Sequence, residues 1–334
     1  MNIGDINISE QVLIVAEIGN NHEGKFDVAQ ELVRQAADCG VHAVKFQAFR
    51  ADHYVSQSDF ARFNRLKSFE LSQAQFVKLA DLAHSLGLLF ISTPFDLESA
   101  RFLVPIVDAI KVASGDNNFY PLINQVSQSD KPLIISTGIS DLDQVKTTFR
   151  LVKDRRQGRN LELIFLHCIA SYPVPLEQVN LLAIPFLSEQ LGLPIGYSDH
   201  TLGIDASIIA VALGACVVEK HFTLDKAFSD FRDHQLSADP EEMKGLVIKI
   251  KSTSAMMGVY AKAVQPCETG MSAVIRRSIA AGKDLTTGHI LEFEDLTWIR
   301  PAGGCNPGEE EKLIGKKLKR DVLFGELLHV TDVD

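Results

Sequence analysis

The sequence predicts an α/β fold: a (β/α)8 barrel followed by a small β-rich domain. Between residue 12 and about residue 222, a β-rich apolar run, a polar cluster and a helical stretch follow one another eight times. Runs that are almost wholly apolar are typical of parallel strands buried on both faces, and eight such units fit one closed barrel. An open, doubly wound sheet is the alternative, because alternation alone does not show closure. The count of eight favours the barrel.

The predicted strands and helix starts follow from local patterns. The strands occupy residues 12–19, 42–47, 88–93, 107–114, 132–138, 161–168, 193–200 and 216–223. Asp27 with Gln30, and Ser72 with Gln75, have the spacing of a capping box, in which side chains and backbone satisfy each other at the first helical turn. Asp239, which precedes a proline, begins a further helix after the eighth strand.

The sequence pattern changes after about residue 265, where short runs broken by Gly and Pro replace the long apolar runs. We therefore predict a barrel domain over residues 1–265, a linker over 266–275 and a turn-rich β domain over 276–334. Because a domain of roughly 60 residues buries little apolar surface, we expect it to dock on another part of the protein.

Composition argues against several classes of function. The formal net charge is −10, whereas nucleic-acid binding needs a basic face. No apolar run is long enough to span a membrane. The first residues do not show the basic start followed by an apolar stretch that would indicate secretion. The five cysteines form no C-x-x-C pair. These features predict a cytoplasmic protein with reduced thiols.

In a barrel of this kind the site lies at the carboxyl ends of the strands, and every predicted strand here ends in polar residues. Two of these residues are lysines, Lys45 and Lys111, whose burial without compensation would be costly. Together with nearby hydroxyl groups they suit a cradle for phosphate and carboxylate. The hydroxyl residues are Thr93, Ser114, Ser136 and Ser198. Any one serine is equally well explained as a group that completes a strand end.

Four carboxylates are candidates for acid–base chemistry: Glu17, Asp116, Glu219 and Asp233. A carboxylate in a cleft can be tuned toward neutral pH, whereas the usual acidic residue is a solvated surface charge. Glu17 and Glu219 are embedded in apolar runs, which argues against the surface interpretation; that interpretation fits Asp233 well. We predict Glu17, Asp116 and Glu219 as the catalytic carboxylates.

Histidines end the neighbouring seventh and eighth strands, at His200 and His221. Two imidazoles with open positions suit a divalent ion that acts as a Lewis acid. A lone histidine is more often a structural residue, and His22, His167 and His234 compete for the same role. His167 lies inside an apolar run and is better explained as a core residue.

The motifs at these strand ends resemble those of the bacterial sialic acid synthases and their nonulosonate relatives. The motifs are AEIGNNHEG (16–24), AVKFQ (43–47), STPFD (92–96), KVASGD (111–116), ISTG (135–138), YSDHTLG (197–203) and EKHFTLDK (219–226). In the tail, RRSIAAGKDL and IRPAGG resemble the small antifreeze-like (SAF) domain of the same family. The matches occur in order over nearly the whole chain, so the resemblance is specific.

The resemblance implies an enzyme that condenses phosphoenolpyruvate with an N-acetylated amino-sugar aldehyde and releases phosphate. It implies that the two lysines and four hydroxyl residues hold phosphoenolpyruvate. It also implies a divalent metal on His200 and His221, usually Mn2+, with Mg2+ or Co2+ as alternatives. Glu17 and Asp116 match acidic positions beside the reacting centre.

The same resemblance implies a sugar-binding side and a quaternary structure. Tyr172 and Asp233 match sugar-side positions. In the implied homodimer, the tail domain of one subunit covers the barrel of its partner, and Arg300 reaches the sugar.

Two departures leave the acceptor open between N-acetylmannosamine and a 2,4-diacetamido trideoxyhexose, which would lead to a legionaminic-type acid. Ala170 stands where the sialic acid type has a polar residue, and the loop SDFRDHQLS (229–237) lacks a Gly-Pro pair. A role in spore-coat polysaccharide synthesis is a further alternative.

Two rival functions come from other classes. Lysines that end barrel strands, Lys45, Lys111 and Lys220, can serve as imine nucleophiles in a Schiff-base aldolase acting on pyruvate. Pyruvate, however, has no phosphate for the hydroxyl-rich cradle to hold. The tail could alternatively be an ice- or glycan-binding module, against which the polar barrel mouth and the missing secretion signal both argue.

Overall fold

The computed structural model describes residues 1–157, 159 and 162–334. The chain divides into two compact units, Met1–Gly258 and Val259–Asp334, and each is described by itself. This division falls after Gly258, whereas the sequence analysis ended the barrel domain at residue 265. The segment predicted as a linker contains two short helices, η3 (Pro266–Glu268) and α12 (Met271–Ile275).

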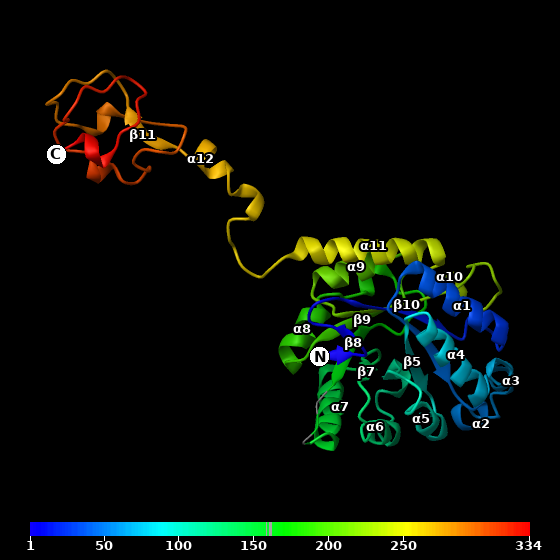
Figure 1. Ribbon diagram of the computed structural model, residues 1–334. Helices are drawn as coiled ribbons and strands as arrows, with labels where there is room; N and C mark the ends of the chain where they lie inside the picture. Colours follow the sequence, from blue (N-terminus) through cyan, green and yellow to red (C-terminus); the bar gives the residue numbers. More distant parts are fainter. Residues whose placement is uncertain (158, 160–161) are drawn as a thin grey trace. The chain divides into compact units, whose positions relative to one another are not determined.

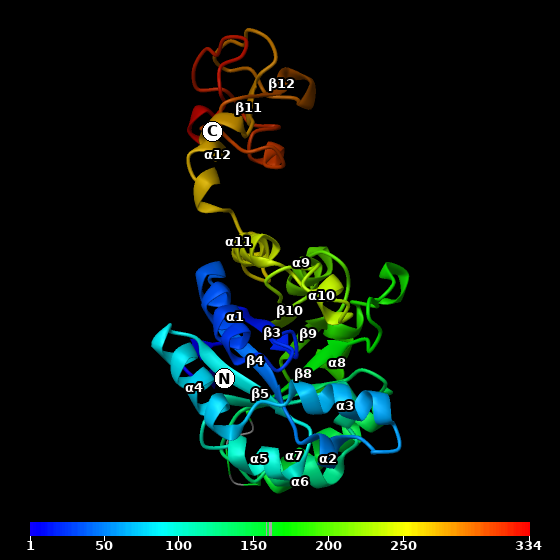
Figure 2. The same ribbon diagram turned by 90° about the vertical axis from the view of Figure 1, so that its right-hand side faces the viewer.

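The first unit is a closed barrel of eight parallel strands surrounded by helices (Figures 1 and 2). Each strand pairs with the next one along the chain, and the last pairs with the first, which excludes the doubly wound alternative. The strands are β3 (Leu13–Gly19), β4 (Ala43–Ala48), β5 (Leu89–Pro94), β6 (Ala109–Val112), β7 (Leu133–Ser136), β8 (Leu163–Cys168), β9 (Ile195–Asp199) and β10 (Val217–His221). They coincide with the predicted runs to within two residues at each end; Leu161, in the sixth run, lies outside the described residues.

Local capping explains where several of the surrounding helices begin. They are α1 (Phe26–Cys39), α4 (Gln73–Ser85), α5 (Leu97–Leu103), α6 (Tyr120–Val126), α7 (Leu142–Arg155), α8 (Ala183–Leu191), α9 (Asp205–Ala212) and α11 (Pro240–Met257). The capping box of Ser72 is confirmed, and Asp239 caps α11. The box predicted at Asp27 is wrong, because Lys25 occupies the N-cap and Asp27 lies in the first turn, where its charge offsets the helix dipole. In the described part of the chain, no helix is long and apolar enough to cross a membrane.

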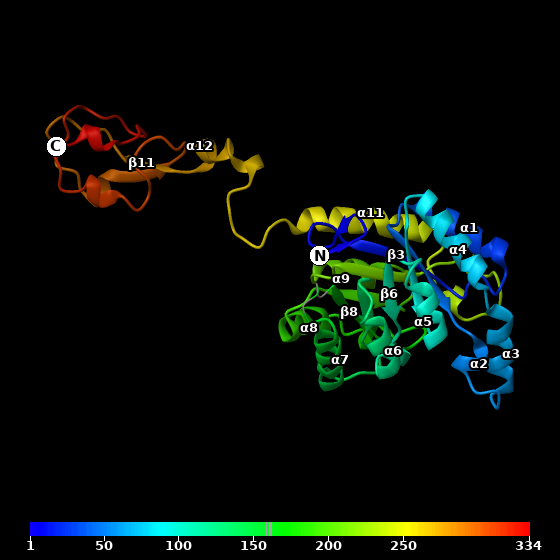
Figure 3. The same cartoon turned by 60° about the horizontal axis from the view of Figure 1, so that its bottom comes forward.

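Three further helices interrupt this regular pattern. The helices α2 (Ala51–Tyr54) and α3 (Phe60–Phe69) lie between β4 and α4, and α10 (Asp233–Leu236) follows β10. Figures 2 and 3 show α2 and α3 at one end of the barrel. A Cβ atom on Gly24 would overlap the carbonyl oxygen of Ser68, so the loop after β3 packs directly on the end of α3. The sequence analysis did not predict this excursion.

Apolar side chains form two layers in the barrel unit. The larger cluster includes residues of both the strands and the surrounding helices, and the smaller one consists mainly of strand residues. A hairpin of β1 (Asn2–Ile3) and β2 (Ile6–Asn7) adds Ile3 and Ile8 to the smaller cluster. Ile3 packs there with residues such as Leu13 that begin strands. The hairpin therefore covers the amino ends of the strands, and the carboxyl ends are left for the site.

The second unit is a small β-rich domain, as the sequence predicts. Its strands β11 (Ser278–Ala281) and β12 (Leu296–Ile299) are antiparallel, and an isolated bridge joins Leu285 to Val322. A separate apolar cluster that includes Ile279 forms its core.

Candidate active site

The carboxyl ends of the strands surround a cavity of about 660 Å3. Because side chains alternate along a strand, every second residue near a strand end points into the barrel. The lining includes most of the residues that the sequence singled out: Glu17, Lys45, Thr93, Lys111, Ser114, Ser136, Tyr172, Ser198, His200, Glu219, His221 and Asp233. One space therefore holds the predicted anion cradle, two predicted catalytic carboxylates and both histidines predicted to bind a metal.

Lys220 is a strand-end residue that points away from this cavity. It lies between Glu219 and His221 on β10, and its Nζ is 3.2 Å from the Asp199 carboxylate and 2.6 Å from the Thr201 carbonyl oxygen. Lys220 and Asp199 are fully buried, and neither lines the cavity. The alternation of β10 thus directs Lys220 into the barrel wall, where it is paired, and its proposed role as an imine nucleophile loses its geometric basis.

Lys45 lies between two glutamates in the cavity. Its Nζ is 3.0 Å from Glu17 Oε2 and 3.5 Å from Glu219 Oε1, and all three side chains are buried. Burial opposes the charge of the ammonium, but the two carboxylates raise the Lys45 pKa above its ordinary value. Burial raises the pKa of Glu17. At Glu219 burial acts in the same direction, but Lys111 and Lys45 outweigh it and lower the pKa. Glu219 is therefore the fixed negative charge, and Glu17 is the carboxylate that takes up a proton more readily.

Lys111 is the second buried cation of the cavity. Its Nζ donates a hydrogen bond to Ser136 Oγ at 2.6 Å and lies 3.9 Å from Glu219 Oε1. Burial lowers the Lys111 pKa. Ser198 Oγ donates to the same Glu219 oxygen at 2.9 Å. Two ammonium groups and several hydroxyls around one space form charge-assisted hydrogen bonds with an oxyanion, so this part of the cavity suits phosphate or carboxylate.

His200 and His221 lie side by side, with ring centroids 5.3 Å apart. His200 Nδ1 is 2.9 Å from the Ile169 carbonyl oxygen, and donation to that oxygen leaves Nε2 free, as in many metal-binding histidines. His221 Nδ1 is buried without a hydrogen-bond partner, and burial keeps the His221 pKa well below its ordinary value. Among the described residues, no three His, Cys, Asp or Glu side chains form a metal-binding group. The two histidines therefore fit a metal only if substrate or water supplies the remaining ligands.

Asp116 does not line the cavity. Asp116 ends η1 (Ser114–Asp116), directly after the cavity-lining Gly115. Its Oδ2 is buried without a partner, and burial raises its pKa to about 6. Arg300 belongs to the second unit, where its Nε donates to the Ile275 carbonyl oxygen at 2.6 Å.

The three histidines that competed for the metal-binding role lie outside the cavity lining and have other partners. His22 Nδ1 accepts from the backbone N–H of Gly24 at 2.9 Å. His167 is buried and bonds the Val179 carbonyl oxygen at 2.8 Å, which agrees with its prediction as a core residue. His234 is held by two side chains that are described below.

Sequence reasoning missed the outer wall of the cavity, because none of its residues ends a strand. The wall comes from α2, α3 and the loops after β7 and β10: Tyr54, Arg62, Arg65, Leu66, Phe69, Ile139, Asp230, Phe231 and Arg232. Arg232 lies 4.7 Å from the Tyr172 ring centroid, and its Nε is 3.3 Å from the Asp233 carboxylate. Ile139 has a φ of 61°, which is rare for a β-branched residue. The basic and aromatic residues between 54 and 69 were the available signal.

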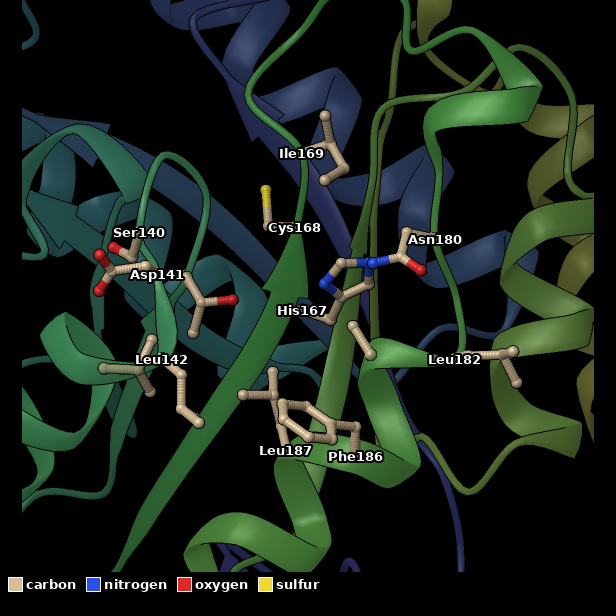
Figure 4. Close-up of a pocket in the computed structure, with 13 residues that line it drawn as sticks. Ser140, Asp141, Leu142, His167, Cys168, Ile169, Asn180, Leu182, Phe186 and Leu187 are labelled. Atoms are coloured by element: carbon tan, nitrogen blue, oxygen red, sulfur yellow. The ribbon is translucent and has the colours of Figure 1, made fainter.

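A second cavity of about 460 Å3 lies beside β8, between the beginnings of α7 and α8 (Figure 4). It shares Cys168 with the first cavity. Its wall is largely apolar, and the His167 side chain points toward Asn180 (Figure 4). Its carboxylate, Asp141, already caps α7. Because buried ions of both signs converge in the first cavity, that cavity is the candidate active site.

A parallel barrel whose mouth holds buried lysines, glutamates and two adjacent histidines defines an enzyme that acts on an anionic substrate. The model of the NeuB family matches residues 32–262. The chain belongs to the NeuB family.

The relatives have similar lengths. The N,N'-diacetyllegionaminic acid synthase of Legionella pneumophila is 39% identical over 94% of this chain and 92% of its own. A pseudaminic acid synthase of Campylobacter jejuni is 32% identical over 99% of each chain. The crystal structure of the N-acetylneuraminic acid synthetase from Leptospira borgpetersenii in complex with citrate has a TM-score of 0.77 and 32% identity. The match covers 81% of this chain and 94% of the Leptospira chain.

Proposed function

We propose that this protein is a nonulosonic acid synthase, which condenses phosphoenolpyruvate with an N-acetylated amino-sugar aldehyde and releases phosphate. The observation that carries the proposal is the convergence of Lys45, Lys111 and several hydroxyl groups beside two glutamates in one cavity. Membership of the NeuB family, and the names of the legionaminic and pseudaminic acid synthases, support it. The enzyme is a transferase that forms a carbon–carbon bond.

Phosphoenolpyruvate carries a phosphate and a carboxylate, and the cradle offers donors for both. In this proposal Lys45 and Lys111 supply positive charge, and hydroxyl groups fix the orientation of the oxyanions. The hydroxyl groups are those of Thr93, Ser114, Ser136 and Ser198.

The electrostatics of the two glutamates suit the chemical steps. C3 of phosphoenolpyruvate attacks the aldehyde carbon of the sugar, the aldehyde oxygen takes a proton from protonated Glu17 and becomes a hydroxyl, and positive charge develops at C2. Water then adds at C2, and phosphate leaves with cleavage of the C–O bond. Glu219, which its lysine neighbours keep ionised, stabilises the positive charge at C2. Glu17, whose pKa is raised, takes the proton that the added water releases.

A divalent metal, Mn2+ in the first instance, forms part of the proposal. His200 and His221 would hold it, with the sugar or water completing the coordination. Such an ion polarises a carbonyl oxygen as a Lewis acid. The free nitrogen of His200 and the depressed pKa of His221 support this choice.

The acceptor sugar is assigned to the side of the cavity formed by Tyr172, Arg232 and Asp233. Ala170 lines the cavity and offers no side-chain hydrogen bond, so it suits an acceptor with fewer hydroxyl groups. This favours a 2,4-diacetamido trideoxyhexose over N-acetylmannosamine. The legionaminic acid synthase at 39% identity points in the same direction.

We further propose a cytoplasmic homodimer in which the second unit of one chain covers the cavity of its partner and places Arg300 near the sugar. Six large apolar side chains are exposed within the first part of the second unit: Val259, Tyr260, Val264, Met271, Val274 and Ile275. An exposed apolar segment of this kind supports an interaction with another surface.

Phosphate release from phosphoenolpyruvate tests the proposed function directly. The purified protein is assayed with Mn2+ and N-acetylmannosamine, with Mn2+ and a 2,4-diacetamido trideoxyhexose, and without an acceptor. We expect release that requires a sugar, is fastest with the diacetamido sugar and stops with EDTA. His221→Ala should abolish release, whereas His84→Ala, which changes an exposed histidine on α4, should not.

A negative result would lead to the rival chemistry. The lowered pKa of Lys111 favours an imine, so borohydride trapping with pyruvate is the corresponding test. Trapping of a lysine without any phosphate release would replace the synthase by a Schiff-base aldolase.

A further inference from the structure

We propose that His234 is a positioning residue, which holds the sugar-side loop in place so that Arg232 and Asp233 keep their positions in the cavity. The sugar-side loop is defined here as residues 225–237, between β10 and α11. This inference rests on the proposed function only in assigning that side of the cavity to the acceptor sugar.

Both ring nitrogens of His234 are engaged with other segments of the barrel unit. The residue is 1% exposed. Its Nδ1 is 2.7 Å from Thr223 Oγ1, and its Nε2 is 3.2 Å from Glu23 Oε1. The Thr223 hydroxyl also donates to the Asp225 carbonyl oxygen at 3.0 Å. Because an ionised carboxylate can only accept, Nε2 of His234 is the donor in the bond to Glu23. His234 therefore connects the sugar-side loop both to the end of β10 and to the loop after β3.

Glu23 is the anchor of this connection. It lies in the loop after β3, with a φ of 49°, and its Oε1 also accepts a hydrogen bond from the Ser229 hydroxyl. One carboxylate oxygen thus binds the sugar-side loop at two points, Ser229 and His234. A left-handed backbone at a residue other than glycine is found where surrounding contacts determine it.

A second set of hydrogen bonds holds the backbone next to the functional carboxylate. Asn21 Nδ2 donates to Ser237 Oγ at 3.0 Å and to the Phe222 carbonyl oxygen at 2.8 Å. Ser237 Oγ donates to the Asp233 carbonyl oxygen at 2.5 Å. The loop after β3 therefore fixes the sugar-side loop on both sides of Arg232 and Asp233.

The geometry separates His234 from the chemistry itself. Both of its nitrogens are bonded, and it does not line the cavity, so it touches neither substrate nor metal. Its neighbours Arg232 and Asp233 do line the cavity, beside Tyr172. Loss of the imidazole should release these two side chains while the phosphoenolpyruvate cradle, which is built on strand ends, stays intact.

The test is the variant His234→Gln, measured by steady-state kinetics with Mn2+. We expect KM for the acceptor sugar to rise about tenfold or more, and KM for phosphoenolpyruvate to change by less than about twofold. The control is His84→Gln, because His84 also bonds a carboxylate, Asp108 at 2.8 Å, but lies on α4 outside the cavity lining. It should leave both constants unchanged.

Limited trypsin digestion gives a readout that does not depend on turnover. Lys226 and Arg232 lie in the sugar-side loop, so cleavage after them should be several-fold faster in His234→Gln than in the wild type or in His84→Gln. Glu23→Ala should reproduce both effects, and Glu23→Gln, which keeps the accepting oxygen, should restore most of the wild-type behaviour.

Either of two results would overturn the proposal. One is an equal rise of both KM values in a protein that unfolds at the wild-type temperature. The other is an unchanged acceptor KM together with unchanged cleavage. If His234→Gln does not fold, Glu23→Ala takes its place under the same criteria. A wild-type protein without condensing activity would contradict the proposed function instead, and the digestion would still test the loop.

Discussion

At the scale of single residues, the cavity keeps a buried ammonium group whose charge is unfavourable for folding. Burial lowers the Lys111 pKa. If the Lys111 ammonium were removed, the neighbouring Glu219 carboxylate would still have Lys45 and Ser198 as partners. Residues of this kind are commonly retained for activity at a cost in stability. Removing the Lys111 charge should therefore affect activity far more than folding.

The corresponding variant is Lys111→Met. We expect phosphate release to fall by about 100-fold or more, because an oriented cation at the oxyanion is lost, while Tm stays equal or rises. Lys78→Met, at an exposed lysine on α4, is the control and should change neither quantity. An unstable but active Lys111→Met protein would show that the lysine serves the fold and not the substrate.

Asp116 predicts a pH dependence of stability. Burial raises its pKa from 3.8 to about 6 in the folded protein. The stability linked to its protonated form is complete below about pH 3.8 and is lost as the pH rises through about 6. Asp116→Asn should therefore be more stable than the wild type at pH 8 by about 1–2 kcal/mol, allowing for partial exposure, and nearly equal at pH 4. Urea denaturation at both pH values measures this, and a variant that is less stable at pH 8 would contradict the assignment.

Residue types at strand ends were predictable from the sequence, but their environments were not. Glu17 and Glu219 look alike in the sequence, and only the positions of Lys45 and Lys111 make their pKa values move in opposite directions. Lys220 follows Glu219 directly, yet it points into the wall. Its direction depends on which face of the strand meets the helices, and an apolar run that is buried on both faces does not reveal this.

At the scale of elements, the contact between the loop after β3 and α3 explains how the mouth of the barrel is built. Gly24 has a φ of +75°, and a Cβ there would overlap the Ser68 carbonyl oxygen. Gly87 has the same φ of +75°, but a Cβ there would meet nothing within 4 Å. The two glycines differ only in their surroundings and make a matched pair.

Gly87→Ala should destabilise the protein by about 1–2 kcal/mol, through the left-handed backbone alone. Gly24→Ala should cost about 1–3 kcal/mol more, because a backbone oxygen must move, and it should raise the acceptor KM by loosening the wall of the cavity. Thermal unfolding and kinetics measure both effects. Equal losses of stability in the two variants would show that α3 can move away from residue 24 without lowering the free energy of unfolding.

The strands of the βα repeat were predictable, whereas the elements outside that repeat were not. Each barrel strand is an almost wholly apolar run that the sequence shows directly, and the capping box of Ser72 adds local hydrogen bonds that do not depend on the rest of the fold. The hairpin at residues 2–7 has strands of two residues each, and α3 has no buried residue. A strand of two residues is too short to show a pattern, and α3 buries no side chain that would mark it as part of the core.

At the scale of the whole molecule, the count of eight strands favoured a closed barrel over an open sheet, and the pairing of the last strand with the first confirms it. The short runs broken by Gly and Pro after about residue 265 were enough to predict a second, β-rich unit. The relation between the two units is a separate question, and the proposed exchange of second units between subunits makes a prediction that a single experiment can test.

That experiment combines two variants, His221→Ala in the barrel unit and Arg300→Ala in the second unit, each of which we expect to lose activity when refolded alone. The chains are unfolded together, refolded and assayed for phosphate release. If each site combines the barrel of one chain with the second unit of its partner, a mixed dimer contains one fully wild-type site. Random pairing should then restore about a quarter of the wild-type activity. If each chain completes its own site, every site in the mixture contains one altered residue and no activity returns. Refolded wild type and each refolded variant alone are the controls, and light scattering confirms that the assayed species is a dimer. Absence of recovery from a mixture that is dimeric would contradict the exchange and leave Arg300 without its proposed role at the sugar.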